Sequence, residues 1–119
     1  LINPKLAEAQ VHGGMSMGLG YALSEEMKFD PATGRLLNGN LLDYKLPTAM
    51  DTPELTALFV ETDDPSGPFG NKALGEPPAI PVAPAIRNAL LHATGVAVDT
   101  LPLNPQKLVE AFQSAGLIE

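Results

Sequence analysis

The stretch FGNKALGEPP, residues 69–78, is the feature around which the rest of the chain is organised. Gly75 permits a close approach that a side chain would block, and Pro77 disfavours the helical region for the residue before it. Glu76 is therefore expected on a stiff, non-helical loop, just before an apolar run with helical spacing. A carboxylate held in this way suits proton transfer, which needs a base fixed within reach of its target. From this peptide alone, a rigid turn with a solvated glutamate is the favoured interpretation.

The composition limits the classes of protein to which the chain can belong. Its 119 residues suffice for a single domain, residues 1–119, with a modest core. The net charge of -7, from 7 basic and 14 acidic residues, argues against a nucleic-acid partner. The absence of cysteine excludes disulfides and thiolate-bound zinc or iron–sulfur clusters built by this chain, and it fits a cytoplasmic protein. The longest weakly polar stretch, residues 11–23, is too short to span a membrane.

A helix is predicted at the N-terminal end of the chain. Asn3 fits the N-cap and Pro4 the first helical position, and apolar residues recur at helical spacing to about Met27. The glycines inside this helix should each cost about 1 kcal/mol relative to alanine. Gly14 and Gly18, with an alanine four residues further on, form a bare stripe on one face. Such a stripe allows either close packing of another segment or contact with a flat ligand, and the spacing does not decide between them.

The remainder of the chain predicts strands followed by helices. Turn residues at 30–34 indicate a hairpin, and residues 55–62, rich in β-branched and aromatic side chains, are the strongest strand candidate. Helices are predicted over residues 80–93 and from an Asn-Pro pair to near the end of the chain, residues 104–116. The predicted fold class is therefore α+β, with a glycine-rich N-terminal helix, a small, mainly antiparallel sheet and two C-terminal helices.

Three sequence motifs are spread along the chain. They are GPFGNKALGEPP at residues 67–78, QVHGG at 10–14 with GLG at 18–20, and DYKLP at 43–47. In their order along the chain and at about their spacing, the three motifs resemble those of the xanthine dehydrogenase and aldehyde oxidase family of molybdenum hydroxylases, and the resemblance covers nearly the whole chain. The resemblance implies the C-terminal part of a molybdopterin-binding subunit. Since Leu1 is not an initiator methionine, the chain is expected to be a fragment or one part of a split subunit.

The resemblance implies a catalytic role for Glu76. The matching glutamate of the family is the general base beside molybdenum, and it takes up a proton from a water-derived oxygen that attacks an aromatic heterocycle or an aldehyde. The expected activity is that of an oxidoreductase acting on a small molecule, within a larger subunit or complex. The cofactor carries the redox chemistry, and protein groups position it. Molybdenum–molybdopterin is expected, in its plain or its cytosine dinucleotide form, with iron–sulfur and FAD centres on other domains or subunits.

The same resemblance implies a set of residues that contact the cofactor. These expected cofactor-binding residues are Gln10, Gly13, Gly14, Lys72, Ala73 and Gly75. An amide that both donates and accepts suits a pterin edge, and a lysine could offset negative charge on the pterin phosphate or dithiolene. From the residues alone, a solvated glutamine and an ordinary surface lysine fit as well. Neither histidine has a partner at metal-ligand spacing, so no protein ligand to a metal is expected.

The chain departs from the family pattern at three positions. Met17 stands where many relatives have glutamine, Leu74 replaces the usual valine, and His12 occupies a position often held by glutamate. These differences keep a second hypothesis open, a non-catalytic fragment or an interaction domain derived from the family. The expected partners are the remainder of the molybdopterin-binding subunit and the iron–sulfur and flavin parts, with no nucleic acid and no membrane.

Overall fold

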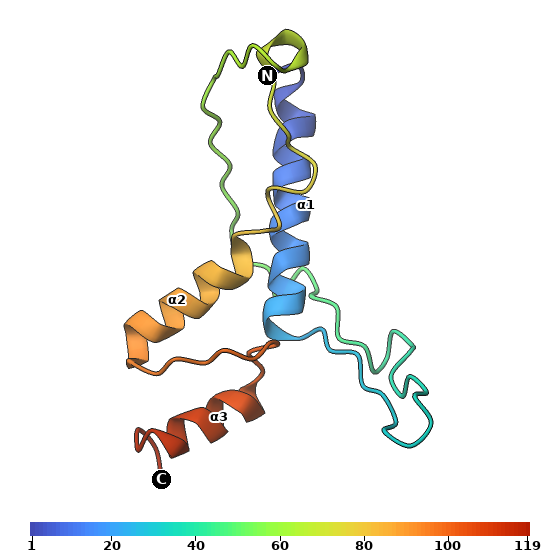
Figure 1. The fold of residues 1–119 in the computed structure, drawn as a ribbon, viewed down its shortest axis with the longest axis vertical. Helices are drawn as coiled ribbons and strands as arrows, with labels where there is room; N and C mark the ends of the chain where they lie inside the picture. The colour runs from blue at the N-terminus through green and yellow to red at the C-terminus, as the bar shows by residue number, and fades with distance from the viewer.

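The computed structural model describes residues 1–119 and consists of three α-helices joined by long irregular connections. Its elements, in chain order, are α1 (Pro4–Leu23), the short 3-10 turn η1 (Pro68–Gly70), α2 (Val82–Thr94) and α3 (Pro105–Ser114). Figure 1 shows α1 along the length of the molecule, with α2 to one side of its C-terminal half and α3 beyond its C-terminal end. The connection from α1 to α2 first leaves the helices, then rises to the N-terminal end of α1 and finally descends beside that helix (Figure 1).

Helix α1 begins where the sequence predicts. The Asn3 side chain accepts a hydrogen bond from the Leu6 amide at 3.1 Å, and Pro4 takes the first helical position. The helix ends at Leu23, four residues before the predicted end. There the amides of the next two residues both bond to the carbonyl of Gly20, at 2.9 and 2.8 Å, which turns the chain out of the helix.

The bare stripe on α1 is covered by another part of the chain. A Cβ added at Gly14 would lie 2.6 Å from the Cβ of Pro78, and one added at Gly18 would lie 2.5 Å from the Cβ of Val82. These two glycines therefore let the end of the glutamate loop and the start of α2 lie directly on the helix, and α1 packs against α2. Ala22 continues the stripe and is completely buried. The close packing offsets the cost of glycine inside a helix.

Helices α2 and α3 lie within two residues of their predicted positions. Gly95, with a φ of 73°, ends α2 in the left-handed conformation that glycine favours. The Asn104 side chain accepts from the Lys107 amide at 2.9 Å and so caps α3. An ion pair of 3.0 Å between Lys107 and Glu26 ties α3 to the segment that follows α1. None of the helices has the length and apolar character needed to cross a membrane.

The predicted α+β class is wrong, because the small, mainly antiparallel sheet does not form. The predicted hairpin is reduced to one antiparallel bridge between Phe29 and Leu36. Residues 55–62, called the extended segment below, form no main-chain hydrogen bond. A strand needs a hydrogen-bonded neighbour, and an isolated two-stranded hairpin is marginal in water. Because no segment of this chain lies beside residues 55–62 as a partner, their high β propensity does not produce a sheet.

The buried interior is small for a chain of this length. The buried apolar residues are few and mostly small: Ala7, Ala22, Ala83, Val98 and Leu103. The radius of gyration is 18.1 Å, whereas a compact domain of this length has a radius of roughly 14 Å. The accessible surface is 8720 Å², whereas a folded monomer of this mass exposes roughly 6,200 Å². About 2,500 Å² of surface is therefore exposed in excess of what an independent domain would show.

Candidate functional site

The loop that carries Glu76 is held along one face of α1 by two hydrogen bonds. Near the start of the helix, the Gln10 side-chain amide donates to the carbonyl of Gly75 at 2.8 Å. Nearer its end, the Tyr21 hydroxyl donates to the carbonyl of Ala79 at 2.7 Å in a partly buried position. Each bond is to the backbone of the loop, so it fixes the course of the chain on either side of the glutamate.

Close packing adds a third attachment between these two hydrogen bonds. Pro78 touches α1 at the position where Gly14 leaves room for it. The loop is also closed internally, because the Ala79 amide donates to the carbonyl of Glu76 at 3.0 Å. With Pro77 limiting its own φ and the conformation of the residue before it, the main chain at the glutamate has little freedom. The expectation of a stiff, non-helical loop is confirmed by this geometry.

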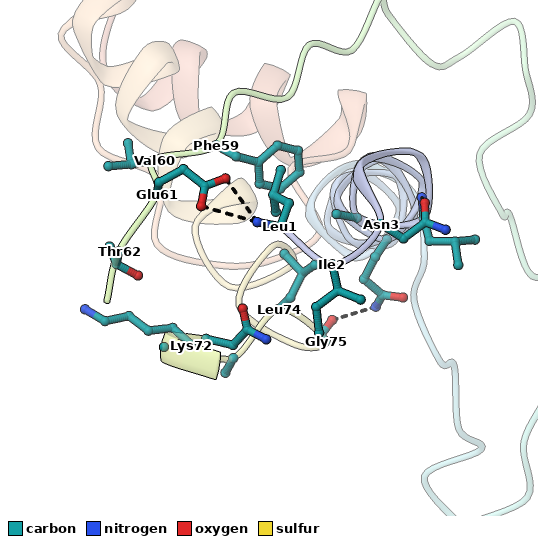
Figure 2. Close-up of a pocket in the computed structure, with 16 residues that line it drawn as sticks. Leu1, Ile2, Asn3, Phe59, Val60, Glu61, Thr62, Lys72, Leu74 and Gly75 are labelled. Atoms are coloured by element: carbon teal, nitrogen blue, oxygen red, sulfur yellow. Dashed lines mark hydrogen bonds and ion pairs between the residues drawn. The ribbon is translucent and has the colours of Figure 1, made fainter. Parts of the chain in front are cut away.

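A cavity of about 530 Å³ lies beside the same loop, between the N-terminal part of α1 and the extended segment. Four of the expected cofactor-binding residues line it: Gln10, Lys72, Ala73 and Gly75. Figure 2 shows Lys72, Leu74 and Gly75 on one side of the cavity and Phe59, Val60 and Glu61 on the other. The volume falls within the range of about 300–1,000 Å³ that is typical of small-molecule sites.

The charged groups of the cavity are arranged unevenly. The main-chain nitrogen of Leu1 donates to the two carboxylate oxygens of Glu61 at 3.0 and 3.3 Å (Figure 2). Lys72 forms no ion pair and remains exposed. An exposed ammonium at the edge of a cavity is able to bind an anionic group such as a phosphate. The Gln10 amide faces the same space and keeps its carbonyl oxygen available as an acceptor.

The other expected site residues lie outside the cavity. Glu76 follows Gly75 in the chain, but it does not line the cavity and its side chain is exposed. A Cβ added at Gly13 would meet no atom within 4 Å, so this glycine faces open space. Gly14 faces Pro78 instead. The structure thus brings Gln10 together with Lys72, Ala73 and Gly75 at the cavity, whereas Gly13 and Gly14 do not line it. The roles of all these residues in cofactor binding and catalysis stay predictions.

The turn that precedes the glutamate loop is ordered by an aspartate. The Asp64 carboxylate accepts hydrogen bonds from the hydroxyl and the amide of Ser66, at 2.6 and 2.9 Å, and these bonds hold its pKa below the usual range. The Asp64 amide in turn donates to the carbonyl of Gly70 at 3.1 Å. Phe69 lies in this turn with a left-handed φ of 55°, a conformation that is uncommon for a residue other than glycine.

Tyr21 holds the main chain of the loop, and the sequence motifs do not include it. It lies seven residues after Gly14, two helical turns further along the same face, and this spacing could have identified it. The third motif, DYKLP at residues 43–47, lies elsewhere, near the C-terminal end of α1, where the Ser24 hydroxyl donates to the carbonyl of Lys45 at 2.8 Å. No group of three or more His, Asp or Glu side chains is arranged to hold a metal ion.

Comparisons with known proteins indicate the class of protein to which the chain is similar. The family model of the molybdopterin cofactor-binding domain matches residues 1–53. The chain is 59% identical over 118 residues to the putative xanthine dehydrogenase molybdenum-binding subunit of Escherichia coli (strain K12), covering 99% of the chain and 16% of that protein. It is 38% identical to the aldehyde oxidoreductase molybdenum-binding subunit of the same organism, covering 92% of the chain and 15% of that protein.

Solved structures agree with these matches. The quinoline 2-oxidoreductase of Pseudomonas putida 86 has a TM-score of 0.86 and 33% identity over 95% of the chain and 15% of that protein. A Cu,Mo-CO dehydrogenase has a TM-score of 0.81 and 31% identity over 99% of the chain and 15% of that protein. The chain belongs to the xanthine dehydrogenase and aldehyde oxidase family of molybdenum hydroxylases, as its motifs indicate. It spans about 11–16% of the length of the curated relatives it matches.

Proposed function

We propose that this chain forms part of the molybdenum-binding subunit of a molybdenum hydroxylase. The whole protein would oxidise an aromatic heterocycle or an aldehyde with an oxygen atom derived from water. This chain would supply the general base Glu76 and one wall of the molybdopterin site. The observation that carries the proposal is the 2.8 Å hydrogen bond from Gln10 to Gly75, because it joins an expected cofactor residue to the neighbour of the expected base at the edge of a cavity.

The residues present suit a pterin cofactor with an anionic phosphate. The Gln10 amide offers a donor and an acceptor for a heterocycle edge, and the Lys72 ammonium offers a positive charge without a competing ion pair. Ala73 and Gly75 keep the loop narrow, so that a flat ring system can approach its backbone. When bound, molybdenum–molybdopterin, in its plain or its cytosine dinucleotide form, would supply the redox chemistry. Iron–sulfur and FAD centres would lie on other domains or subunits.

Glu76 suits the role of a general base because the loop that carries it is fixed on α1. Its main chain is held by the contacts of the flanking residues with α1, whereas its exposed side chain remains able to rotate toward a substrate. A general base must lie within hydrogen-bond reach of the proton that it accepts, and a fixed loop maintains that reach. The small-molecule substrate would be positioned largely by parts of the subunit outside this chain.

The large exposed surface supports a place within a larger protein. Counted on both partners, an excess of about 2,500 Å² on this chain corresponds to roughly 5,000 Å² of interface, which is within the range of permanent interfaces. We therefore propose that residues 1–119 are a piece of a molybdopterin-binding subunit, whose remainder is the first partner of the chain. A cytoplasmic location fits the lack of cysteine, and the net charge of -7 gives no basis for binding nucleic acid.

One observation favours a second candidate function. The cavity gathers four expected cofactor residues but does not include Glu76, which is also the arrangement expected of a non-catalytic interaction domain that keeps only the family's scaffold. Cofactor content separates the two candidates. The test is to purify the native protein that contains this chain and to assay molybdenum and released pterin. Near-stoichiometric metal and pterin are expected for the hydroxylase, and their absence would favour the interaction domain.

A further inference from the structure

The extended segment, residues 55–62, has an unpaired backbone. None of its amides or carbonyls forms a main-chain hydrogen bond, although its sequence is the strongest strand candidate in the chain. Figure 1 shows it as an isolated ribbon that rises beside α1 without a neighbour at its outer side. A row of unpaired donors and acceptors on an extended backbone is the template onto which another strand adds.

The side chains of the segment already follow the two-residue period of a strand. Leu55, Ala57 and Phe59 are partly covered by the rest of the chain. The alternate residues face solvent, and among them Leu58 is 92% and Val60 87% exposed. Because successive side chains of a strand point to opposite faces, this alternation indicates one face that this chain covers and one face that it leaves bare.

The charges around the segment indicate the chemistry of what covers it. Residues 51–71 contain no lysine or arginine, and the acidic residues of this stretch are Asp51, Glu54, Glu61, Asp63 and Asp64. A second copy of this chain, paired edge to edge, would bring carboxylates of the two copies together, and like charges opposite each other destabilise a strand pair. A strand with alternating apolar residues and basic residues at its ends would complement both the bare face and the charge.

We propose that residues 55–62 become a β-strand by pairing with an extended segment in the remainder of the molybdenum-binding subunit, whose apolar side chains cover Leu58 and Val60. The chain spans 16% of the relative that it matches over 99% of its own length, so the larger part of such a subunit lies outside it. This inference rests on the proposal that the chain is a piece of that subunit, and it does not depend on a catalytic role for Glu76. In the whole subunit, residues 55–62 would then be one strand of a sheet whose neighbouring strand lies outside this chain.

Amide hydrogen exchange in the native protein that contains this chain tests the pairing. Alternate amides of residues 55–62, those on the edge that faces the partner strand, are expected to exchange at least about 100-fold more slowly than in an unfolded reference peptide, because a paired strand opens only by local unfolding. Exchange at the unfolded rate would overturn the proposal. Protection that appears only as the protein self-associates with rising concentration would assign the face to a second copy, and it too would overturn the proposal.

A matched pair of variants tests the bare face separately. Leu58→Asp places a charge on the face that the partner strand would cover, while Met50→Asp makes the same change at a 93% exposed loop residue. At least a several-fold lower yield of assembled subunit is expected for Leu58→Asp alone, and equal yields from the two variants would contradict the pairing. Molybdenum content distinguishes the two proposals. Protected amides without bound metal would support the strand pairing and contradict the proposed hydroxylase function. Bound metal with unprotected amides would support the hydroxylase function and contradict the strand pairing.

Discussion

The substitution Gly14→Ala tests whether the glutamate loop depends on its contact with α1. The added methyl group would lie 2.6 Å from the Cβ of Pro78 and 3.1 Å from the amide nitrogen of Ala79. Carbon atoms in favourable contact are about 3.5–4.0 Å apart, so the loop must move by about 1 Å. Because the closest atom belongs to a proline ring close to its own main chain, a rotamer change cannot relieve the overlap. The displacement therefore reaches the backbone next to Glu76.

A shift of this size is large for a catalytic group. Misplacement by about 1 Å costs on the order of 100-fold in rate, which corresponds to about 2.7 kcal/mol of activation free energy. Overpacking should also lower the free energy of unfolding by about 1–3 kcal/mol, and the higher helix propensity of alanine should return about 1 kcal/mol of that loss. We therefore expect Gly14→Ala to lower kcat by roughly 100-fold while destabilising the protein only modestly.

The assay is kcat per bound molybdenum, measured on the native protein together with its thermal unfolding. Gly18→Ala is the matched control, because its methyl group would lie 2.5 Å from the Cβ of Val82, at the start of α2 rather than on the loop. It should destabilise the protein by a similar amount and reduce kcat less. Wild-type kcat in Gly14→Ala, or an equal loss in both variants, would refute the idea that the Gly14 contact positions the glutamate.

Two further predictions concern the hydrogen bonds around the loop. Tyr21→Phe removes the hydroxyl that donates to the Ala79 carbonyl, so it should lower the free energy of unfolding by about 1 kcal/mol and lower kcat with little change in KM. Tyr44→Phe, away from the loop, is the control, and equal kinetics in the two variants would rule out a positioning role for Tyr21. The hydrogen bonds from the Ser66 hydroxyl and amide lower the pKa of Asp64. At pH values above the usual aspartate pKa of about 3.9, the ionised carboxylate therefore stabilises the turn. This stabilisation is lost as the pH falls toward the lowered pKa. The protection of amides across the turn, taken relative to their intrinsic exchange rate at each pH, should therefore decrease only below about pH 4, and a decrease that begins near neutral pH would contradict this cause.

Local signals in the sequence identify the helices well. An Asn-Pro pair precedes both α1 and α3, and in each case the asparagine side chain accepts from an amide three residues later. Gly95 ends α2 in the conformation that the pattern predicts. The end of α1 differs from the prediction by four residues, because the hydrogen bonds to Gly20 that end the helix leave no distinct mark in the sequence.

The sheet and the site could be predicted only in part. Residues 55–62 carry the composition of a strand, but a strand exists only with a partner, and composition does not reveal where the partner lies. The packing role of Gly14 was one of two interpretations that its spacing left open, and the structure places Pro78 on it. Tyr21 went unnoticed because a hydroxyl bonded to a backbone carbonyl depends on how the loop runs over the helix. Glu76 and Gln10 were predicted as site residues from their motifs, and only Gln10 lines the cavity.

The most direct test of the proposed function is turnover by a Glu76→Gln variant of the native protein, with molybdenum measured in the same sample. Glutamine keeps the size and shape of the side chain but cannot accept the proton, so the loop and its contacts with α1 should remain. Molybdenum is expected to stay bound while turnover falls by at least about 100-fold. Turnover at the wild-type rate would contradict the assignment of Glu76 as the general base.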